Sequence, residues 1–184
     1  MIAIVQAFWR ICLFKGGPES IPASNFLLTL VILLNALITF FAGWILQSAL
    51  PTPESAQLTP EQIATLQSPL ATLTRAVIGL VSTAVLVWGM LNLMGHAERV
   101  PRTLSAFFGT DAILKILTLL AVPVTLNTSS MLAEISIVAL FFWKVVTFGF
   151  ILHRAMSIGV GLGVVAGLFI LIFTFAVSQV AIGL

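Results

Sequence analysis

Charged side chains are scarce in this chain: only 8% of its 184 residues are Asp, Glu, Lys or Arg. A soluble domain usually carries about 25% charged residues. Hydrophobic residues make up 60% of the chain, so there is too little polar surface to cover a water-soluble monomer. This composition excludes a soluble globular domain and requires apolar surface to face lipid or a partner.

Other residue types and motifs are also missing. A single cysteine, Cys12, excludes an internal disulfide and a multi-cysteine metal site. The eight Lys and Arg residues are scattered, which argues against nucleic-acid binding. No HExxH, GxSxG or Walker-type phosphate loop occurs. We therefore expect no catalytic, cofactor-binding or metal site, and no enzymatic activity.

Long apolar runs fill most of the sequence instead. About 20 apolar residues in a helix, at about 1.5 Å rise per residue, match the ~30 Å hydrocarbon core of a bilayer. The sequence predicts an all-α fold, a polytopic membrane bundle of five transmembrane helices, as a single domain over 1–184. The predicted spans are roughly Phe26–Leu50, Leu70–Met94, Ser105–Val122, Met131–Leu152 and Ile158–Ile182.

The first 23 residues form a separate unit before the bundle of residues 24–184. Residues 1–14 are apolar but too short to cross a membrane, and Gln6 and Arg10, four apart, form a polar stripe on a helix. This pattern predicts an amphipathic interfacial helix, which lies along the membrane or docks against the bundle. Two glycines and two prolines in Lys15–Ala23 then break the helix, and Ser24 or Asn25 caps the first span.

Basic residues are distributed unequally between the two sides of the predicted bundle. Lys and Arg in short loops favour the cytoplasm. The sequence therefore predicts a cytoplasmic N-terminus and a C-terminus on the outside. One side holds Arg10, Lys15, Arg99, Arg102 and Arg154, and the other holds only Arg75.

Five charged residues lie within the apolar runs, where each costs about 2.5–3.5 kcal/mol on insertion scales and usually pairs or faces a wet cavity. By depth, Arg75 is expected to pair with Glu134. Asp111 and Lys115 are four apart on one helix, and Lys144 lies at a similar depth, which predicts a three-membered cluster. Three roles stay open for these charges: structural pairing, contact with an anionic lipid or small anion, and an ion or proton path.

Three glycines at the start of the last span have a spacing that favours close helix packing. Gly159, Gly163 and Gly167 are four apart, so they are expected on one helix face, where small residues let two backbones approach. The face packs either inside the bundle or against a second copy in a homodimer. The flanking apolar runs argue against a nucleotide-binding loop.

The five-span layout resembles the Yip1-type membrane proteins, especially their small bacterial relatives. The segments that carry the resemblance are FWRICLFKGGPESIPAS near the start and ILHRAMSIGVGLG at the junction of the last two spans. The resemblance implies a bacterial inner (plasma) membrane location, with the role left open. The Tyr-Gly-Pro sequence of eukaryotic members is absent, so their small-GTPase partners are not implied.

The sequence thus predicts a non-catalytic inner-membrane protein, an accessory or scaffold that binds another membrane protein or organises lipid. The expected partners are membrane lipids, with a membrane-protein partner or homo-oligomer also open, and no nucleic acid. The alternative is a small transporter or channel subunit with an ion, proton or anion path near Asp111, Lys115 and Lys144. A cavity that reaches Lys144 favours transport, and a dry bundle with all charges paired favours a structural role.

Overall fold

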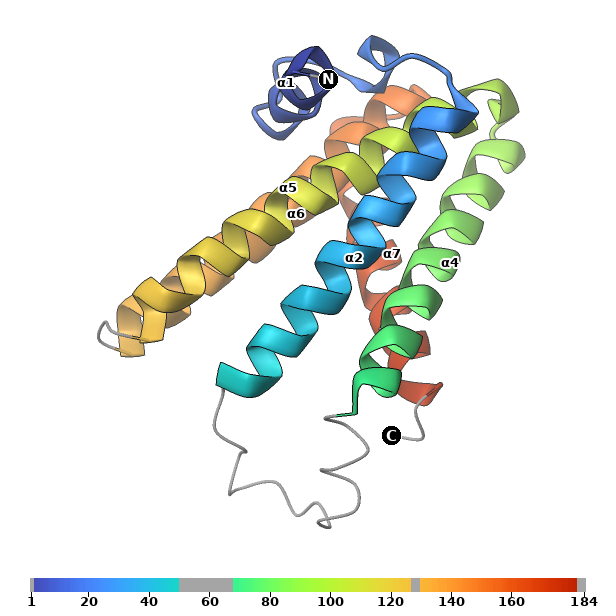
Figure 1. The fold of residues 1–184 in the computed structure, drawn as a ribbon. Coiled ribbons are helices and arrows are strands. Elements are labelled where there is room, and N and C mark those ends of the chain that lie inside the picture. The colour runs from blue at the N-terminus through green and yellow to red at the C-terminus, as the bar shows by residue number, and fades with distance from the viewer. Residues whose placement is uncertain (1, 50–67, 127–129, 182–184) are drawn as a thin grey trace.

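The computed structural model describes residues 2–49, 68–126 and 130–181, and every element described there is helical (Figure 1). Five of the helices are long and apolar enough to cross a membrane. The predicted all-α bundle is confirmed, and by length and composition the chain is a multi-pass integral membrane protein. The elements are α1 (Ile2–Cys12), η1 (Pro18–Ser20), α2 (Asn25–Ala49), α4 (Pro69–Leu93), η2 (Ala97–Arg99), α5 (Val100–Leu126), α6 (Ser130–Met156) and α7 (Val160–Val180).

Local sequence signals explain several helix ends. The hydroxyl of Ser24 accepts a hydrogen bond from the backbone N–H of Leu27 at the start of α2, and Ser68 does the same for Ala71 in α4. Gly95 ends α4 with a positive φ of 76°. The backbone N–H of His96 then reaches back to the carbonyl of Leu91, the bond that closes a Schellman motif.

Two spans are longer than the apolar runs indicated. α5 begins at Val100 rather than near Ser105, because Pro101 fits the first turn, where its missing N–H is not needed. α5 also continues past Pro123 to Leu126. α6 continues to Met156, so His153 and Arg154 belong to its last turn rather than to the following loop. The predicted ends at Leu50 and Ile182 lie outside the described residues.

α5 is the central span of the bundle. It contacts both α2 and α6, and α7 packs on both α6 and α4 (Figure 1). More than half of the apolar window of α5 is buried, 56% against 17–33% for the other four spans. Its neighbours therefore present most of their apolar side chains outward, as lipid-facing helices do.

α1 is docked against the bundle by one face. Phe8, Ile11 and Cys12 are buried, whereas Val5 and Trp9 are exposed. The Phe8 ring lies over Gly109 of α5, where a Cβ atom would come within 2.5 Å of the ring. The indole Nε1 of Trp143 in α6 donates a hydrogen bond of 2.9 Å to the carbonyl of Cys12. The short amphipathic helix predicted before the bundle thus exists, with its buried face on α5 and α6.

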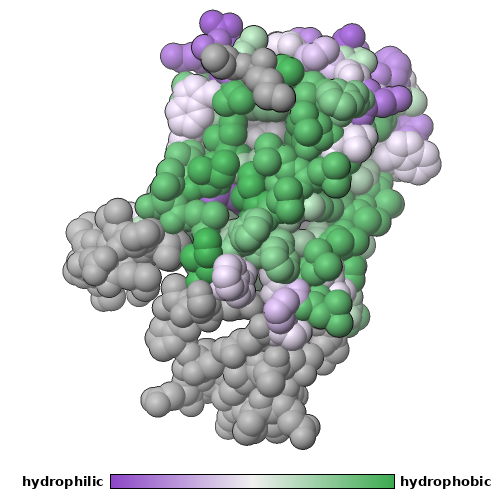
Figure 2. All heavy atoms as spheres, in the orientation of Figure 1, coloured by the Kyte–Doolittle hydropathy of each residue, from purple (hydrophilic) through white to green (hydrophobic). Residues whose placement is uncertain are grey.

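The outer surface shows how polar and apolar residues are distributed. Hydrophobic residues form a continuous band over the spans in Figure 2, and hydrophilic residues gather at the end of the bundle that carries α1. A hydrophilic spot is also visible in a recess of the apolar band. Charged groups therefore reach into the bundle at membrane depth.

Candidate functional site

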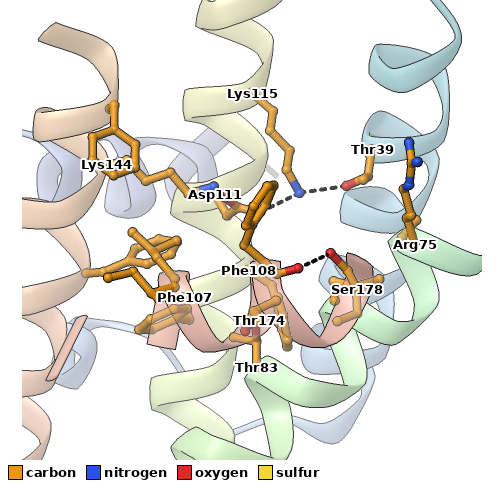
Figure 3. A pocket seen from close by; sticks show the side chains of 18 residues that line it. Thr39, Arg75, Thr83, Phe107, Phe108, Asp111, Lys115, Lys144, Thr174 and Ser178 are labelled. Atoms are coloured by element: carbon orange, nitrogen blue, oxygen red, sulfur yellow. Dashed lines mark hydrogen bonds and ion pairs between the residues drawn. The ribbon is translucent and has the colours of Figure 1, made fainter. Parts of the chain in front are cut away.

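The charged cluster at the middle of the bundle is centred on Asp111. Its carboxylate oxygen Oδ2 lies 2.6 Å from Nζ of Lys115, one turn further along α5. The other oxygen, Oδ1, lies 2.8 Å from Nζ of Lys144 on α6. Figure 3 shows the two lysines reaching Asp111 from different helices. The structure thus brings together the three residues that the sequence placed in one cluster.

Two polar residues of α2 complete this cluster. The side-chain amide of Asn35 donates to Oδ2 of Asp111 at 3.0 Å and to the carbonyl of Phe108 at 2.8 Å. Lys115 donates to Oδ1 of Asn35 at 2.9 Å and to the hydroxyl of Thr39 at 2.6 Å. Asn35 is fully buried. Because one amide contacts both members of the Asp111–Lys115 pair, α2 is tied to α5 by a connected polar network.

Lys144 is held by a second kind of contact. Its ammonium group lies 5.4 Å from the ring centroid of Phe148, one turn further along α6. A cation over an aromatic face is attracted by the ring quadrupole. The side chain of Lys144 stays 27% exposed. The side chain of Lys144 is therefore more open to its surroundings than that of Asp111.

A cavity of about 570 Å³ adjoins the cluster. All five spans line it, and its walls are mostly apolar, with several phenylalanines among them. The lining charges are Arg75, Lys115, Lys144 and Asp111, which leaves two more positive than negative groups. The charged cluster is thus one wall of an internal space.

Arg75 enters the cavity from α4, across the view from Lys144 in Figure 3. Its Nε is buried and has no hydrogen-bond partner among the described residues. Its predicted partner, Glu134, has a side chain outside the described part of the structure. Within that part, Arg75 is a cation that lines the cavity without an ion pair.

α6 and α7 pack backbone against backbone at a group of glycines. A Cβ on Gly163 would lie 2.4 Å from the carbonyl oxygen of Gly149 in α6, and one on Gly167 would lie 2.9 Å from the Gly149 nitrogen. Gly159 takes no part in this contact: it is the N-cap of α7, is exposed, and would place a Cβ in open space. The glycine face packs inside the bundle, through Gly163 and Gly167.

Beyond these glycines, α7 contacts α4. Thr174 of α7 and Thr83 of α4 share a hydrogen bond of 3.2 Å between their hydroxyls (Figure 3). A Cβ on Gly79 would lie 3.6 Å from the Thr174 methyl group. The space between this α4–α7 contact and the α5–α6 pair is the cavity.

Sequence reasoning predicts a hydrogen bond between helices for Asn35 but does not place it in this cluster, and it missed Thr39 and Gly149. Asn35 and Thr39 are four apart on the first span, a polar pair in an apolar run. That spacing is a usable signal, since an amide at membrane depth usually bonds between helices. Gly149 stands alone in its helix, so no spacing marks it. No cluster of three or more potential metal ligands occurs among the described residues.

Comparisons with known proteins give no identification: no family model, no curated protein and no solved structure matches this chain. The resemblance to the Yip1-type proteins therefore stays a prediction. The function must be argued from the cavity and its charges.

Proposed function

We propose that this protein is a non-catalytic membrane protein that holds an anionic amphiphile, such as an anionic lipid, in the cavity beside Asp111. The observation that carries the proposal is a space of about 570 Å³ with excess positive charge at membrane depth. Ligand sites typically measure about 300–1,000 Å³ and combine apolar walls with a few polar groups. Of the roles predicted from the sequence, organising lipid fits this space best.

The charges of the cavity favour an anion. Asp111 contacts both lysines, so one positive charge of the cluster has no counter-charge within it. Arg75 adds a second positive charge with a planar fork of donors that suits carboxylate or phosphate. A bound anion lowers the free energy of these groups, because isolated charges at this depth are costly.

The walls favour a ligand that also has an apolar part. Aromatic side chains on α5, α6 and α7 line the cavity, and four hydroxyl groups are the main uncharged polar contribution. A fully polar anion would leave these aromatic faces without a partner. The aromatic residues are Phe107, Phe108, Phe141, Phe148 and Phe175, and the hydroxyls belong to Thr39, Thr83, Thr174 and Ser178.

Native mass spectrometry of the purified protein tests the proposal. We expect the wild type to retain one anionic amphiphile through detergent exchange. Arg75→Gln should lower its occupancy about tenfold, because a charge-assisted hydrogen bond is worth about 1.5–3 kcal/mol. Ser178→Leu should lower it by filling the cavity. Arg10→Gln makes the same charge change outside the cavity and is the matched control.

Two results would overturn the proposal. One is a wild-type protein that carries no anionic ligand after gentle extraction into native nanodiscs. The other is equal retention by the wild type and Arg75→Gln. A stoichiometric membrane protein in the same preparation, without a bound amphiphile, would instead favour the accessory role.

A transporter is the second candidate, because all five spans line a cavity that reaches Lys144. Proteoliposome uptake of the retained anion separates the two roles. Time-dependent accumulation that Ser178→Leu abolishes would favour transport. Binding without accumulation would favour a lipid-holding role. A bacterial inner-membrane location with a cytoplasmic N-terminus, and the Yip1-type kinship, belong to this proposal as well.

A further inference from the structure

A second cavity, of about 380 Å³, lies at the end of the bundle that carries α1. It is independent of the central cavity and shares no lining residue with it. Three arginines, one each from η2, α5 and α6, and one carboxylate line it: Arg99, Arg102, Arg154 and Glu19. We propose that this arginine cavity binds the phosphate group of an anionic ligand, with an anionic phospholipid headgroup as its membrane source.

The three arginines come from distant parts of the chain. Arg99 ends η2 and Arg102 lies in the first turn of α5, while Arg154 lies in the last turn of α6. The α5–α6 contact brings these two helix ends together. The positive groups are thus held beside the N-terminus of α5, whose dipole also favours an anion.

Arg99 and Arg154 are held in place by contacts that leave some of their N–H donors free. Nη1 of Arg99 donates to the carbonyl of Ala155 at 3.0 Å and to the hydroxyl of Ser157 at 3.1 Å. Its Nε lies 3.6 Å from the exposed carboxylate of Glu98, which does not line the cavity. Nη1 of Arg154 lies 3.3 Å from the carboxylate of Glu19, and its guanidinium lies 5.5 Å from the Phe150 ring centroid. Each guanidinium carries five N–H donors, so both can still donate to a ligand.

Arg102 has no ion pair or hydrogen bond among the described residues and is exposed. With Glu19 as the only acid lining the cavity, the lining groups carry two more positive than negative charges. Arginine forks match phosphate oxygens in geometry. A basic pocket between helices at a membrane surface is where lipid headgroups are recognised.

Lipid titration followed by native mass spectrometry tests the arginine cavity. We expect the protein in detergent to bind one phosphatidylglycerol more tightly than phosphatidylcholine, whose choline carries an opposing positive charge. Arg102→Gln should weaken phosphatidylglycerol binding about tenfold. Arg102→Lys should restore part of it. Lys15→Gln removes a charge at the same end but outside the cavity, and should leave binding unchanged.

A second arm distinguishes the source of the phosphate. Competition of inorganic phosphate with phosphatidylglycerol, lost in Arg102→Gln, would support a site for free phosphate. Lipid binding without such competition would support the headgroup. Equal lipid binding by the wild type and Arg102→Gln overturns the proposal, and so does an equal loss in Lys15→Gln. Thermal unfolding of each variant shows that the fold is intact.

The two proposals fail separately. Arg75→Gln tests the central cavity and leaves the arginine cavity complete, whereas Arg102→Gln does the reverse. Loss of the bound amphiphile in Arg75→Gln therefore does not contradict phosphate binding at the arginine cavity, which Arg102→Gln tests separately.

Discussion

Asp111 is the residue on which the polar interior depends most. Its carboxylate contacts two ammonium groups and the amide of Asn35, and only 10% of its side chain is exposed. Removing one partner of a buried ion pair leaves an uncompensated charge, which costs more than the pair contributed. Loss of Asp111 would leave two lysines without a counter-charge, whereas loss of one lysine would leave Asp111 paired with the other.

Asp111→Asn should be more damaging than Lys144→Leu. The asparagine leaves Lys115 and Lys144 without a counter-charge, whereas Lys144→Leu leaves the Asp111–Lys115 pair intact. We expect Asp111→Asn to lower the free energy of unfolding by roughly 3–5 kcal/mol. Thermal unfolding in detergent measures both variants. Equal melting of Asp111→Asn and the wild type would contradict a structural role for the network.

Cys12 should react slowly with thiol reagents. Burial raises the pKa of its thiol to about 12, so at pH 8 the thiolate, which is the reactive form, is on the order of 10⁻⁴ of the total. Below this pKa each unit rise in pH should raise the rate of maleimide labelling about tenfold. Labelling of folded and SDS-unfolded protein at pH 7 and 8 measures this. Equal labelling rates for the folded and the SDS-unfolded protein would contradict the burial of Cys12 between α1 and the bundle.

At the scale of elements, α7 is held by two contacts, one with α6 and one with α4. Gly149 meets Gly163 and Gly167 with backbone against backbone, so a side chain at either glycine of α7 would force the two helices to shift. The hydrogen bond between Thr83 and Thr174 then holds the other half of α7 on α4. Thr83 and Thr174 also line the central cavity.

Gly163→Ala should destabilise the bundle, because its Cβ would lie 2.4 Å from the Gly149 carbonyl and backbone would have to move. Overpacking of this kind costs about 1–3 kcal/mol. Gly161→Ala on the same helix is the matched control, since its Cβ would meet nothing within 4 Å. Melting temperatures of the two variants give the comparison. Equal melting temperatures of the two variants would mean that α6 and α7 can move apart at Gly163 without a loss of stability.

At the scale of the whole molecule, hydrophilic side chains gather at the end that carries α1, and the spans form an apolar band (Figure 2). The basic residues of that end are Arg10, Lys15, Arg99, Arg102 and Arg154. This asymmetry is the basis for the proposed orientation, since Lys and Arg near membrane surfaces favour the cytoplasm. The same basic end carries the arginine cavity, so anionic lipids of the inner leaflet are its expected source of phosphate.

Cysteine labelling in intact cells tests the orientation in a Cys12→Ala background. A cysteine at Ser55, between α2 and α4, should react with a membrane-impermeant maleimide. One at Arg102, at the basic end, should react only after the membrane is permeabilised. The opposite pattern would show an inverted topology and remove the inner leaflet as the source of the phosphate ligand.

Parts of the candidate site could be predicted from the sequence. Asp111 and Lys115 are four apart on one helix, so their pairing follows from helix geometry. Lys144 was matched to them by depth alone, and it does contact Asp111. Asn35 was not placed with them, because its rotation about the α2 axis depends on which face of α2 meets α5. Gly149 gave no signal, because it is the single glycine of its helix and no spacing marks it.

The sequence by itself determined the five spans, the short helix before them and the shortage of charge, because bilayer thickness and helix periodicity act on local runs of residues. Only the tertiary structure decided that Asn35 joins the Asp111 cluster and that all five spans line a cavity beside it. It also decided that Arg99, Arg102 and Arg154 line one cavity. These are matters of helix rotation and crossing, which are set by packing between segments far apart in the chain.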